Sequence, residues 1–245
     1  MKGLILAAGK GARMKGINYN KCLGIVVNKS LISHNIERLI FMGIREIIIV
    51  IGKDSDKIKS HVEVYHNKAD ILYVEQEIQL GIVDAIKCAV SLIGSDDFVL
   101  CLGDEIFYNQ KPVEMLEYFI RTEADCICGI VSNESENEIK KCYSVVVDKS
   151  NKILELMEKP EKPYNDLKGT GFCIFKNRML EHIIEVSQNS KSGQYDLCDW
   201  IRICIDKGLI CKVFNFAEKE FNINTLEDLN QANKFLNSSD RRGNK

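Results

Sequence analysis

Short, wholly apolar runs alternate with amphipathic segments along the first half of this chain, and this alternation restricts the fold most. Residues 46–51 form an almost wholly apolar, β-branched run, typical of a strand that is covered on both faces. Before it, a helical repeat follows Ser30 and ends at Gly43, and residues 98–102 repeat the buried-strand pattern. Alternation of strand, helix and strand implies parallel strands joined by right-handed crossovers. We therefore predict an α/β fold.

The chain opens with an apolar run of strand length that breaks into small residues and cations. The run reads Leu4-Ile5-Leu6-Ala7-Ala8-Gly9, and Lys10, Gly11, Ala12 and Arg13 follow it. Small residues let a ligand approach the backbone closely, and consecutive N–H groups in such a loop form a concave anion site. Lys21 adds a further cation. Because open α/β sheets bind ligands at the carboxyl ends of strands, we interpret this loop as a cradle for nucleotide phosphates.

Two other segments place polar side chains at the same expected edge. Gln76 and Gly81 stand between a predicted strand and a predicted helix, where a glutamine offers both a donor and an acceptor to a base. Asp104 directly follows the buried strand 98–102, where a carboxylate is well placed to hold Mg²⁺ against phosphates. The competing interpretations are a solvated loop glutamine and an aspartate that caps the next segment.

No repeat, low-complexity block or linker divides the 245 residues. We predict one domain over residues 1–237, with a nucleotide-binding half of about 1–130 and an acceptor-binding half of 131–237. Thr225 and Asp228 have capping-box spacing for a closing helix that we expect to end near Leu236. The polar residues 238–245 are expected to be a disordered tail. A further helix is expected at 178–186, and further strands at 125–131, 143–147, 153–157, 172–175 and 209–216.

Charge and cysteine usage restrict the partners and the compartment. The formal net charge of −2 argues against a general nucleic-acid binder, and no apolar run has the length of a membrane span. The start of the chain lacks the pattern of a signal peptide, so we expect a cytoplasmic protein. The ten cysteines form no CxxC pair and fall mostly in apolar runs, which favours buried, reduced thiols over a zinc site.

Taken together, these motifs identify a family. The chain resembles the sugar-1-phosphate nucleotidyltransferases, in particular their short, glucose-1-phosphate thymidylyltransferase-like members. The resemblance spans nearly the whole chain and implies a Rossmann-like three-layer α/β fold, with a mixed, mostly parallel sheet and helices on both faces. The matching segments, in the order of the family, are 6–14, 21–23, Gln76 with Gly81, 102–107, 158–160, 170–175, 195–199 and 222–229.

The resemblance implies a role for each matching residue. Arg13 would bind the departing pyrophosphate, Lys21 would stabilise charge at the α-phosphate, and Lys159 would hold the phosphate of the acceptor. Asp104 and Asn222 would be the Mg²⁺ ligands. The residues that would contact the nucleotide are Leu6, Ala7, Ala8, Gly9, Gly11, Ala12, Gln76 and Gly81. Those that would contact the acceptor are Glu105, Ser144, Glu158, Lys159, Thr170 and Trp200.

The reaction that the resemblance implies uses no protein nucleophile. A phosphate oxygen of a sugar-1-phosphate attacks the α-phosphorus of a nucleoside triphosphate in line, and pyrophosphate leaves. Such transfers require positioning and charge neutralisation, which a site of Lys, Arg, backbone N–H groups and Mg²⁺ supplies. The expected partners are therefore a nucleoside triphosphate and a phosphorylated small molecule, with no nucleic acid and no membrane. Assembly into a homodimer is a further possibility.

Some positions depart from the family pattern. Asn20 replaces the proline before the loop lysine, from which we expect a looser loop. Glu105 stands where the family has asparagine, and Ser144 where a strand usually has glycine. Asn222 occupies a position that is Asp in thymidylyltransferases and Asn in the acetylglucosamine-1-phosphate uridylyltransferase branch.

These departures leave the acceptor open. Glu105, Ser144, Asp196 and Trp200 could surround an acceptor with a cationic group, because carboxylates and an indole suit ion pairing and cation–π contact. The alternative function is then a cytidylyltransferase acting on a choline- or aminoethyl-type phosphate or phosphonate. The simpler interpretation is that the carboxylates are solvated and Trp200 packs in the core. A non-catalytic subunit that senses sugar nucleotides is the remaining alternative, although Arg13, Lys21, Asp104 and Lys159 are all present.

Overall fold

The fold is built on one mixed β-sheet. The structure, a computed structural model, describes residues 1–9, 20–52 and 55–243. Within these residues nine strands form the main sheet, and four short strands form two separate ribbons, β7–β13 and β2–β3. The main-sheet strands are β1 (Lys2–Leu6), β4 (Glu46–Ile51), β5 (Asp70–Glu75), β6 (Phe98–Leu102), β8 (Cys126–Val131), β9 (Tyr143–Val147), β10 (Ile153–Glu158), β11 (Lys168–Phe175) and β12 (Cys211–Asn215). The ribbon strands are β2 (Ile25–Val26), β3 (Lys29–Ser30), β7 (Glu105–Tyr108) and β13 (Lys219–Asn222).

Strand order joins the two halves of the chain. Strands β6, β1, β4 and β5 are parallel neighbours in that order, as the strand–helix–strand alternation predicts. Strand β11 then pairs antiparallel with β6, and it also pairs with β8 and β9. Beyond them, β9 pairs with β10 and β8 with β12. One long strand of the second half therefore links the parallel first half to every other strand of the sheet.

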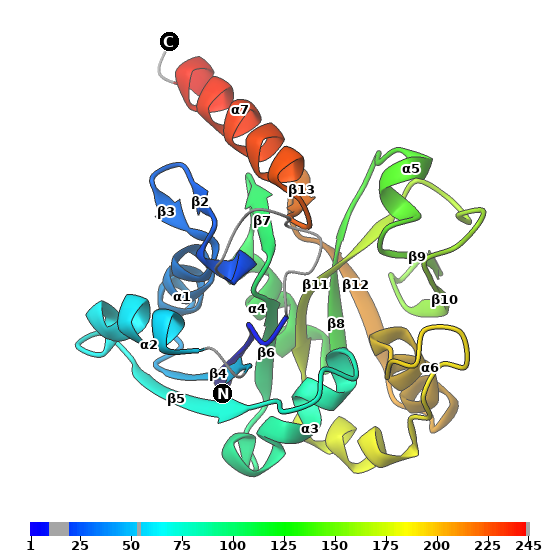
Figure 1. Cartoon of the computed structure of the whole chain (residues 1–245). Coiled ribbons are helices and arrows are strands. Elements are labelled where there is room, and N and C mark those ends of the chain that lie inside the picture. The colour runs from blue at the N-terminus through cyan, green and yellow to red at the C-terminus, as the bar shows by residue number, and fades with distance from the viewer. Residues whose placement is uncertain (10–19, 53–54, 244–245) are drawn as a thin grey trace.

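Helices cover both faces of this sheet (Figure 1). The α-helices are α1 (Leu31–Phe41), α2 (Asp56–Val62), α3 (Ile82–Ile93), α4 (Pro112–Thr122), α5 (Glu136–Ile139), α6 (Leu197–Asp206) and α7 (Leu226–Gly243). Three 3₁₀ segments accompany them: η1 (Lys21–Leu23), η2 (Glu63–Tyr65) and η3 (Asn177–Glu185). Adjacent residues of β1 show the two faces, because Leu4 packs in a core with α3, η3 and α6, whereas Ile5 packs in a core with α1, α2 and α4. The predicted three-layer α/β fold is confirmed.

Side-chain caps fix where two helices begin. The Ser30 side chain accepts a hydrogen bond from the Ser33 N–H at the start of α1. At the start of α7, the Asp228 N–H donates to Thr225 Oγ1 at 3.1 Å, and Asp228 Oδ2 accepts from the Thr225 N–H at 2.8 Å. This reciprocal pair is the predicted capping box.

The structure corrects the sequence predictions at three places. Residues 177–185 are 3₁₀ rather than α-helical, and the ribbon of β7 and β13 was not predicted because its strands are only four residues long. Helix α7 does not end near Leu236 but continues to Gly243, so residues 238–243 are helical. The loss of apolar periodicity after Leu236 marks where the helix leaves the core, because a solvated helix needs no apolar face. Figure 1 shows α7 projecting away from the sheet. No helix of the described part of the chain is long and apolar enough to cross a membrane.

Candidate active site

Four parallel strands end side by side, and backbone hydrogen bonds join the residues that follow them. The Ala7 N–H donates to Val50 O at 2.8 Å, the Gly103 N–H to Leu6 O at 2.9 Å, and the Gln76 N–H to Ile51 O at 2.8 Å. The opening loop, Asp104 and Gln76 therefore start from one edge of the sheet, as predicted from strand direction.

The start of the opening loop is described, and its middle is not. Ala7 and Ala8 are buried, and Gly9 is exposed. The predicted site residues Gly11, Ala12 and Arg13 lie outside the described residues.

The far end of this loop is held by Asn20. Its Nδ2 donates to Ala7 O at 2.7 Å, and its Oδ1 accepts from the Cys22 N–H at 2.9 Å, which caps η1. The side chain thus connects the two ends of the loop, where the replacement of proline predicted a looser chain. A proline there, which has no amide side chain, could not make these two bonds. Sequence reasoning missed this role because it considered only the lost rigidity of proline.

Lys21 and Asp104 meet at the centre of this edge. Their side chains form an ion pair in which both partners are mostly shielded from solvent. Lys21 also passes close to Gly9, since a Cβ added at Gly9 would lie 3.4 Å from Lys21 Cε. The structure therefore brings together the loop, a cation and a carboxylate that are predicted to act on one triphosphate.

Asn222 reaches the same place from the other end of the chain. It is the last residue of β13 and pairs with Glu105 of β7, and the next residue, Ile223, donates its N–H to Asp104 O at 2.8 Å. The side-chain oxygen of Asn222, Oδ1, accepts from Asn224 Nδ2 at 2.7 Å. Backbone pairing thus brings Asp104 and Asn222, the two predicted metal ligands, into neighbouring segments, although more than a hundred residues separate them in the sequence.

The donor chemistry of these two residues fits Mg²⁺, which prefers carboxylate and carbonyl oxygens. Among the described residues, no group of three or more His, Cys, Asp or Glu side chains could hold a metal ion. A cation bound by Asp104 and Asn222 would therefore take its remaining ligands from water and substrate phosphates, which is usual for Mg²⁺.

Gln76 is oriented by a residue that the sequence did not single out. It is only 4% exposed, and its Nε2 donates to Asp84 Oδ2 at 2.7 Å and to Gly81 O at 3.3 Å. Because an amide nitrogen that faces a carboxylate must be the donor, Asp84 in the first turn of α3 fixes which way the amide points. Its spacing from Gln76 matches no local periodicity, so only the fold reveals this contact.

Gly81 is the contact between this loop and the second half of the chain. Its φ of +105° is a conformation that favours glycine, and an added Cβ would lie 2.8 Å from Tyr195 O and 2.9 Å from Tyr195 N. The Tyr195 N–H donates to Leu80 O at 2.7 Å, and Tyr195 O accepts from the Val83 N–H at 3.2 Å. The segment that leads into α6 is thereby bonded to the start of α3.

Glu158 is the last residue of strand β10, and Lys159 follows it. Lys159 Nζ lies 3.2 Å from Glu158 Oε1, and the Cys198 thiol donates to Glu158 Oε2 at 3.4 Å. Burial raises the pKa of Glu158, and the charge of Lys159 opposes that rise. Lys159 keeps 57% of its side chain exposed, so its ammonium can meet a ligand from solvent.

Ser144 and Thr170 are buried, and their hydroxyl groups form hydrogen bonds with main-chain groups. Thr170 Oγ1 donates to Gly129 O at 2.9 Å, and Ser144 Oγ accepts from the Tyr164 N–H at 3.1 Å. Both residues hold the strands and the loop around the expected acceptor site in place.

Glu105 does not stand free to meet a cation. It is 2% exposed, and its two carboxylate oxygens accept from the Gly171 N–H at 3.0 and 2.9 Å. Burial raises the pKa of Glu105 well above its ordinary value, and the neighbouring charges of Glu220 and Asp104 add to the rise. Asp196 is 8% exposed and accepts from Asn189 Nδ2 at 2.9 Å.

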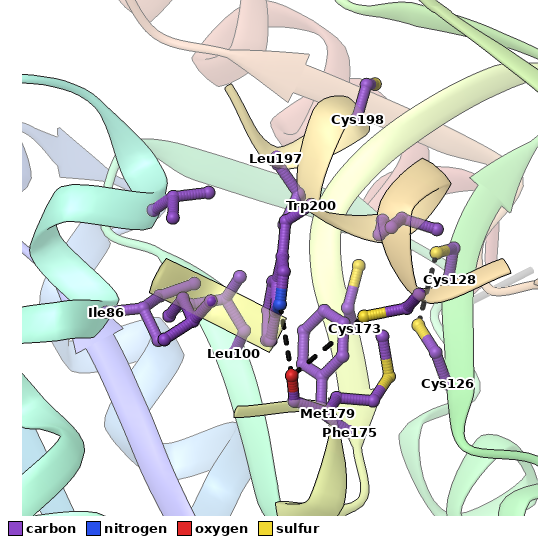
Figure 2. Close-up of a cluster of buried hydrophobic side chains, with 14 of the residues drawn as sticks. Ile86, Leu100, Cys126, Cys128, Cys173, Phe175, Met179, Leu197, Cys198 and Trp200 are labelled. Carbon is purple, nitrogen blue, oxygen red and sulfur yellow. Dashed lines mark hydrogen bonds between the residues drawn. The ribbon is translucent and has the colours of Figure 1, made fainter. Parts of the chain in front are cut away.

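Trp200 is not among the residues that the structure brings to the site, which corrects its predicted contact with the acceptor. Its side chain is fully buried, and its indole N–H donates to Met179 O at 3.2 Å (Figure 2). The ring lies beside Phe175, with a centroid separation of 4.9 Å. The physical reason is the position of Trp200 on the inner face of α6, which turns a large apolar side chain into the core.

Comparison with known proteins identifies the family of the chain. The sequence profile of the family described as "Nucleotidyl transferase" matches residues 2–239. The UTP–glucose-1-phosphate uridylyltransferase AglF of Haloferax volcanii is 27% identical over 238 residues, which cover 96% of each chain. A glucose-1-phosphate thymidylyltransferase of Streptomyces antibioticus is 28% identical over 85% of this chain and 58% of its own length.

Solved structures show the same fold. A putative glucose-1-phosphate thymidylyltransferase from Bacillus anthracis, in complex with a sucrose, superposes with a TM-score of 0.85 at 24% identity, covering 96% of this chain and 94% of the other. The family match extends over nearly the whole chain and includes every described motif on which the resemblance rests. This chain therefore belongs to the nucleotidyl transferase family, among the sugar-1-phosphate nucleotidyltransferases.

Proposed function

We propose that this chain is a Mg²⁺-dependent enzyme that transfers a nucleoside monophosphate from a nucleoside triphosphate to a sugar-1-phosphate. The products are a nucleoside diphosphate sugar and pyrophosphate. The observation that carries the proposal is the meeting of Lys21, Asp104 and the Asn222 segment beside Gly9, at the carboxyl edge of the parallel strands. The names of the relatives favour UTP or dTTP as donor and glucose-1-phosphate as acceptor.

In the proposed reaction, an oxygen of the acceptor phosphate forms a bond to the α-phosphorus of the triphosphate. The bond between the α-phosphorus and the oxygen that bridges it to the β-phosphorus breaks, and pyrophosphate leaves. Mg²⁺, held by Asp104 and Asn222, would neutralise charge on the triphosphate. Lys21 would meet the charge that develops at the α-phosphate, and Lys159 would hold the acceptor phosphate in line. Arg13, in the glycine loop, would bind the departing pyrophosphate.

The test is release of pyrophosphate from each of UTP, dTTP, CTP, ATP and GTP with a panel of acceptors, with and without Mg²⁺. We expect turnover only with Mg²⁺, and preferentially with a sugar-1-phosphate. Preference for CTP with phosphocholine or aminoethylphosphonate would instead support the alternative acceptor class. Nucleotide binding without turnover in any combination would refute an enzymatic role and favour a sensing subunit.

Asp104→Asn keeps the size of the side chain and removes its charge. We expect loss of more than about 99% of the Mg²⁺-dependent turnover, because a ligand to the cation that neutralises the triphosphate is weakened. The matched control is Asp206→Asn, a change to an exposed carboxylate at the distant end of α6, which should leave turnover unchanged. Full activity of Asp104→Asn would refute the metal assignment.

A further inference from the structure

The two proposed Mg²⁺ ligands depend on a ribbon that is separate from the main sheet. Asp104 immediately precedes β7, and Asn222 ends β13. Within the described part of the chain, these two strands pair only with each other. The position of both ligands relative to the opening loop therefore depends on what fastens this ribbon to the sheet.

Strand β11 holds the ribbon through Lys168, its first residue, which belongs to none of the motifs that match the family. Its ammonium lies 2.7 Å from Glu220 Oε2 in β13 and donates to Glu220 O at 3.3 Å. Glu134 Oε1 lies 3.5 Å from the same nitrogen. Three residues further along β11, the Gly171 N–H is bound by Glu105 of β7. One strand of the main sheet thus holds both strands of the ribbon.

These groups are withdrawn from water. The side chains of Lys168 and Glu220 are 1% and 0% exposed, and that of Glu134 is 6% exposed. The Lys168 ammonium lies between two carboxylates, and Asp104 adds negative charge near Glu220. Removal of the lysine alone would leave buried carboxylates without their cation, which is strongly destabilising.

Stability alone does not account for such a pair. An apolar pair of similar volume usually serves stability as well or better, because both charges lose their hydration on burial. A directional pair between two elements does fix their relative position. Glu220 stands two residues before Asn222 and faces Phe107 across the ribbon, so a shift of Glu220 moves the whole end of the ribbon.

We propose that Lys168 is a positioning residue, whose contact with Glu220 holds the β7–β13 ribbon against β11 and so sets the relative placement of Asp104 and Asn222. This role rests on the proposed function, in which those two residues hold Mg²⁺. Lys168 contacts neither the cation nor the substrate.

The experiment compares Lys168→Met with the double variant Lys168→Met/Glu220→Leu. The single variant should melt at a lower temperature. The double variant should regain the melting temperature, because Glu220 is removed together with its partner and Glu134 keeps Lys219, whose Nζ lies 3.9 Å away. Mn²⁺ binding to the enzyme–nucleotide complex, measured by electron paramagnetic resonance without acceptor, should nevertheless weaken about tenfold in the double variant, as for other changes to groups that orient metal ligands. The Mg²⁺ concentration for half-maximal turnover should rise in parallel.

The matched control is Lys2→Met. Lys2 is also largely buried, and its ammonium donates to Leu92 O at 2.8 Å and lies 3.5 Å from Glu46, at the opposite end of β1 from the site. This variant should lower the melting temperature without changing Mn²⁺ affinity.

Wild-type Mn²⁺ affinity in the stable double variant would overturn the role of Lys168 and leave the proposed function standing. Absence of Mg²⁺-dependent turnover in the wild-type protein with every donor and acceptor would overturn the proposed function itself.

Discussion

Lys159 combines backbone strain with a proposed role in binding the acceptor phosphate. Its φ of +43° is in the left-handed region, which costs a non-glycine residue about 1–2 kcal/mol. The Lys159 N–H donates to the carbonyl oxygen of Cys142, the residue before β9, at 2.6 Å, and this bond helps to hold the conformation. The bend turns the chain immediately after Glu158, and strain of this kind is found where a side chain must be aimed.

Lys159→Met should raise the KM for the acceptor about 10- to 100-fold, because a charged hydrogen bond to a phosphate is worth about 1.5–3 kcal/mol. The KM for the nucleoside triphosphate should change little. Steady-state kinetics with each substrate varied in turn measure this split. Lys162→Met, a change to an exposed lysine of the same loop, is the control. Equal effects of the two variants would contradict the assigned role.

Trp200→Phe separates a core role from an acceptor role. We expect the free energy of unfolding to fall by about 1–3 kcal/mol, because the Met179 carbonyl loses its donor and a cavity opens beside Phe175. Acceptor KM should stay at the wild-type value. Since the chain has a single tryptophan, the fluorescence of the wild-type protein should also show no response to acceptor. A large rise in the acceptor KM would show that the Trp200 indole contributes to acceptor binding.

At the scale of elements, the sequence predicts what is local and misses what is tertiary. Strands β4 and β9 have the predicted bounds, because β-branched apolar runs are local signals. The placement of Gln76, Asp104 and Lys159 on strand ends followed from the same signals. The bond of Glu105 to Gly171 and the orientation of Gln76 by Asp84 join elements whose side-chain directions no periodicity reveals.

Helix α1 carries a pH-dependent contact. Burial lowers the pKa of His34 below its ordinary 6.5, and its Nε2 lies 2.8 Å from Val26 O, next to Lys29, Glu37 and Arg38. As the pH falls, His34 is therefore protonated near pH 6.5 in the unfolded chain but only at a lower pH in the folded chain. The stability due to this group is present above that pH and is lost as the pH falls through the lower folded value.

His34→Gln should therefore flatten the decline of the melting temperature between pH 7 and pH 5. Calorimetry across that range measures the slope. His66→Gln, at an exposed histidine after η2, is the control and should leave the slope unchanged. An unaltered slope in His34→Gln would show that other groups cause the decline.

At the scale of the whole molecule, the two halves share one sheet. Strand β11 pairs through residues 173–175 with residues 98–100 of β6, and the core that contains Leu4 also contains Trp200. Neither half can therefore keep its buried strand edge covered without the other.

Unfolding should consequently be a single cooperative transition. In a urea titration, the fluorescence of Trp200, which reports the second half, and the far-ultraviolet circular dichroism of all helices should give coincident midpoints. Midpoints that differ by more than the fitting error would show that the halves unfold separately.

The cysteines of this protein have a practical consequence for measuring how often its folded structure opens. All ten are free, and eight of them are buried, among them Cys126 and Cys128, whose sulfur atoms lie 3.5 Å apart (Figure 2). Burial raises the pKa of Cys101, and that of Cys22, to about 12, so we expect the folded state to protect these thiols from alkylating reagents. Pulsed alkylation followed by peptide mass spectrometry would therefore record how often strands β6, β8, β11 and β12 expose their thiols. The natural sequence thus contains a set of footprinting probes in the strands, with no engineered label.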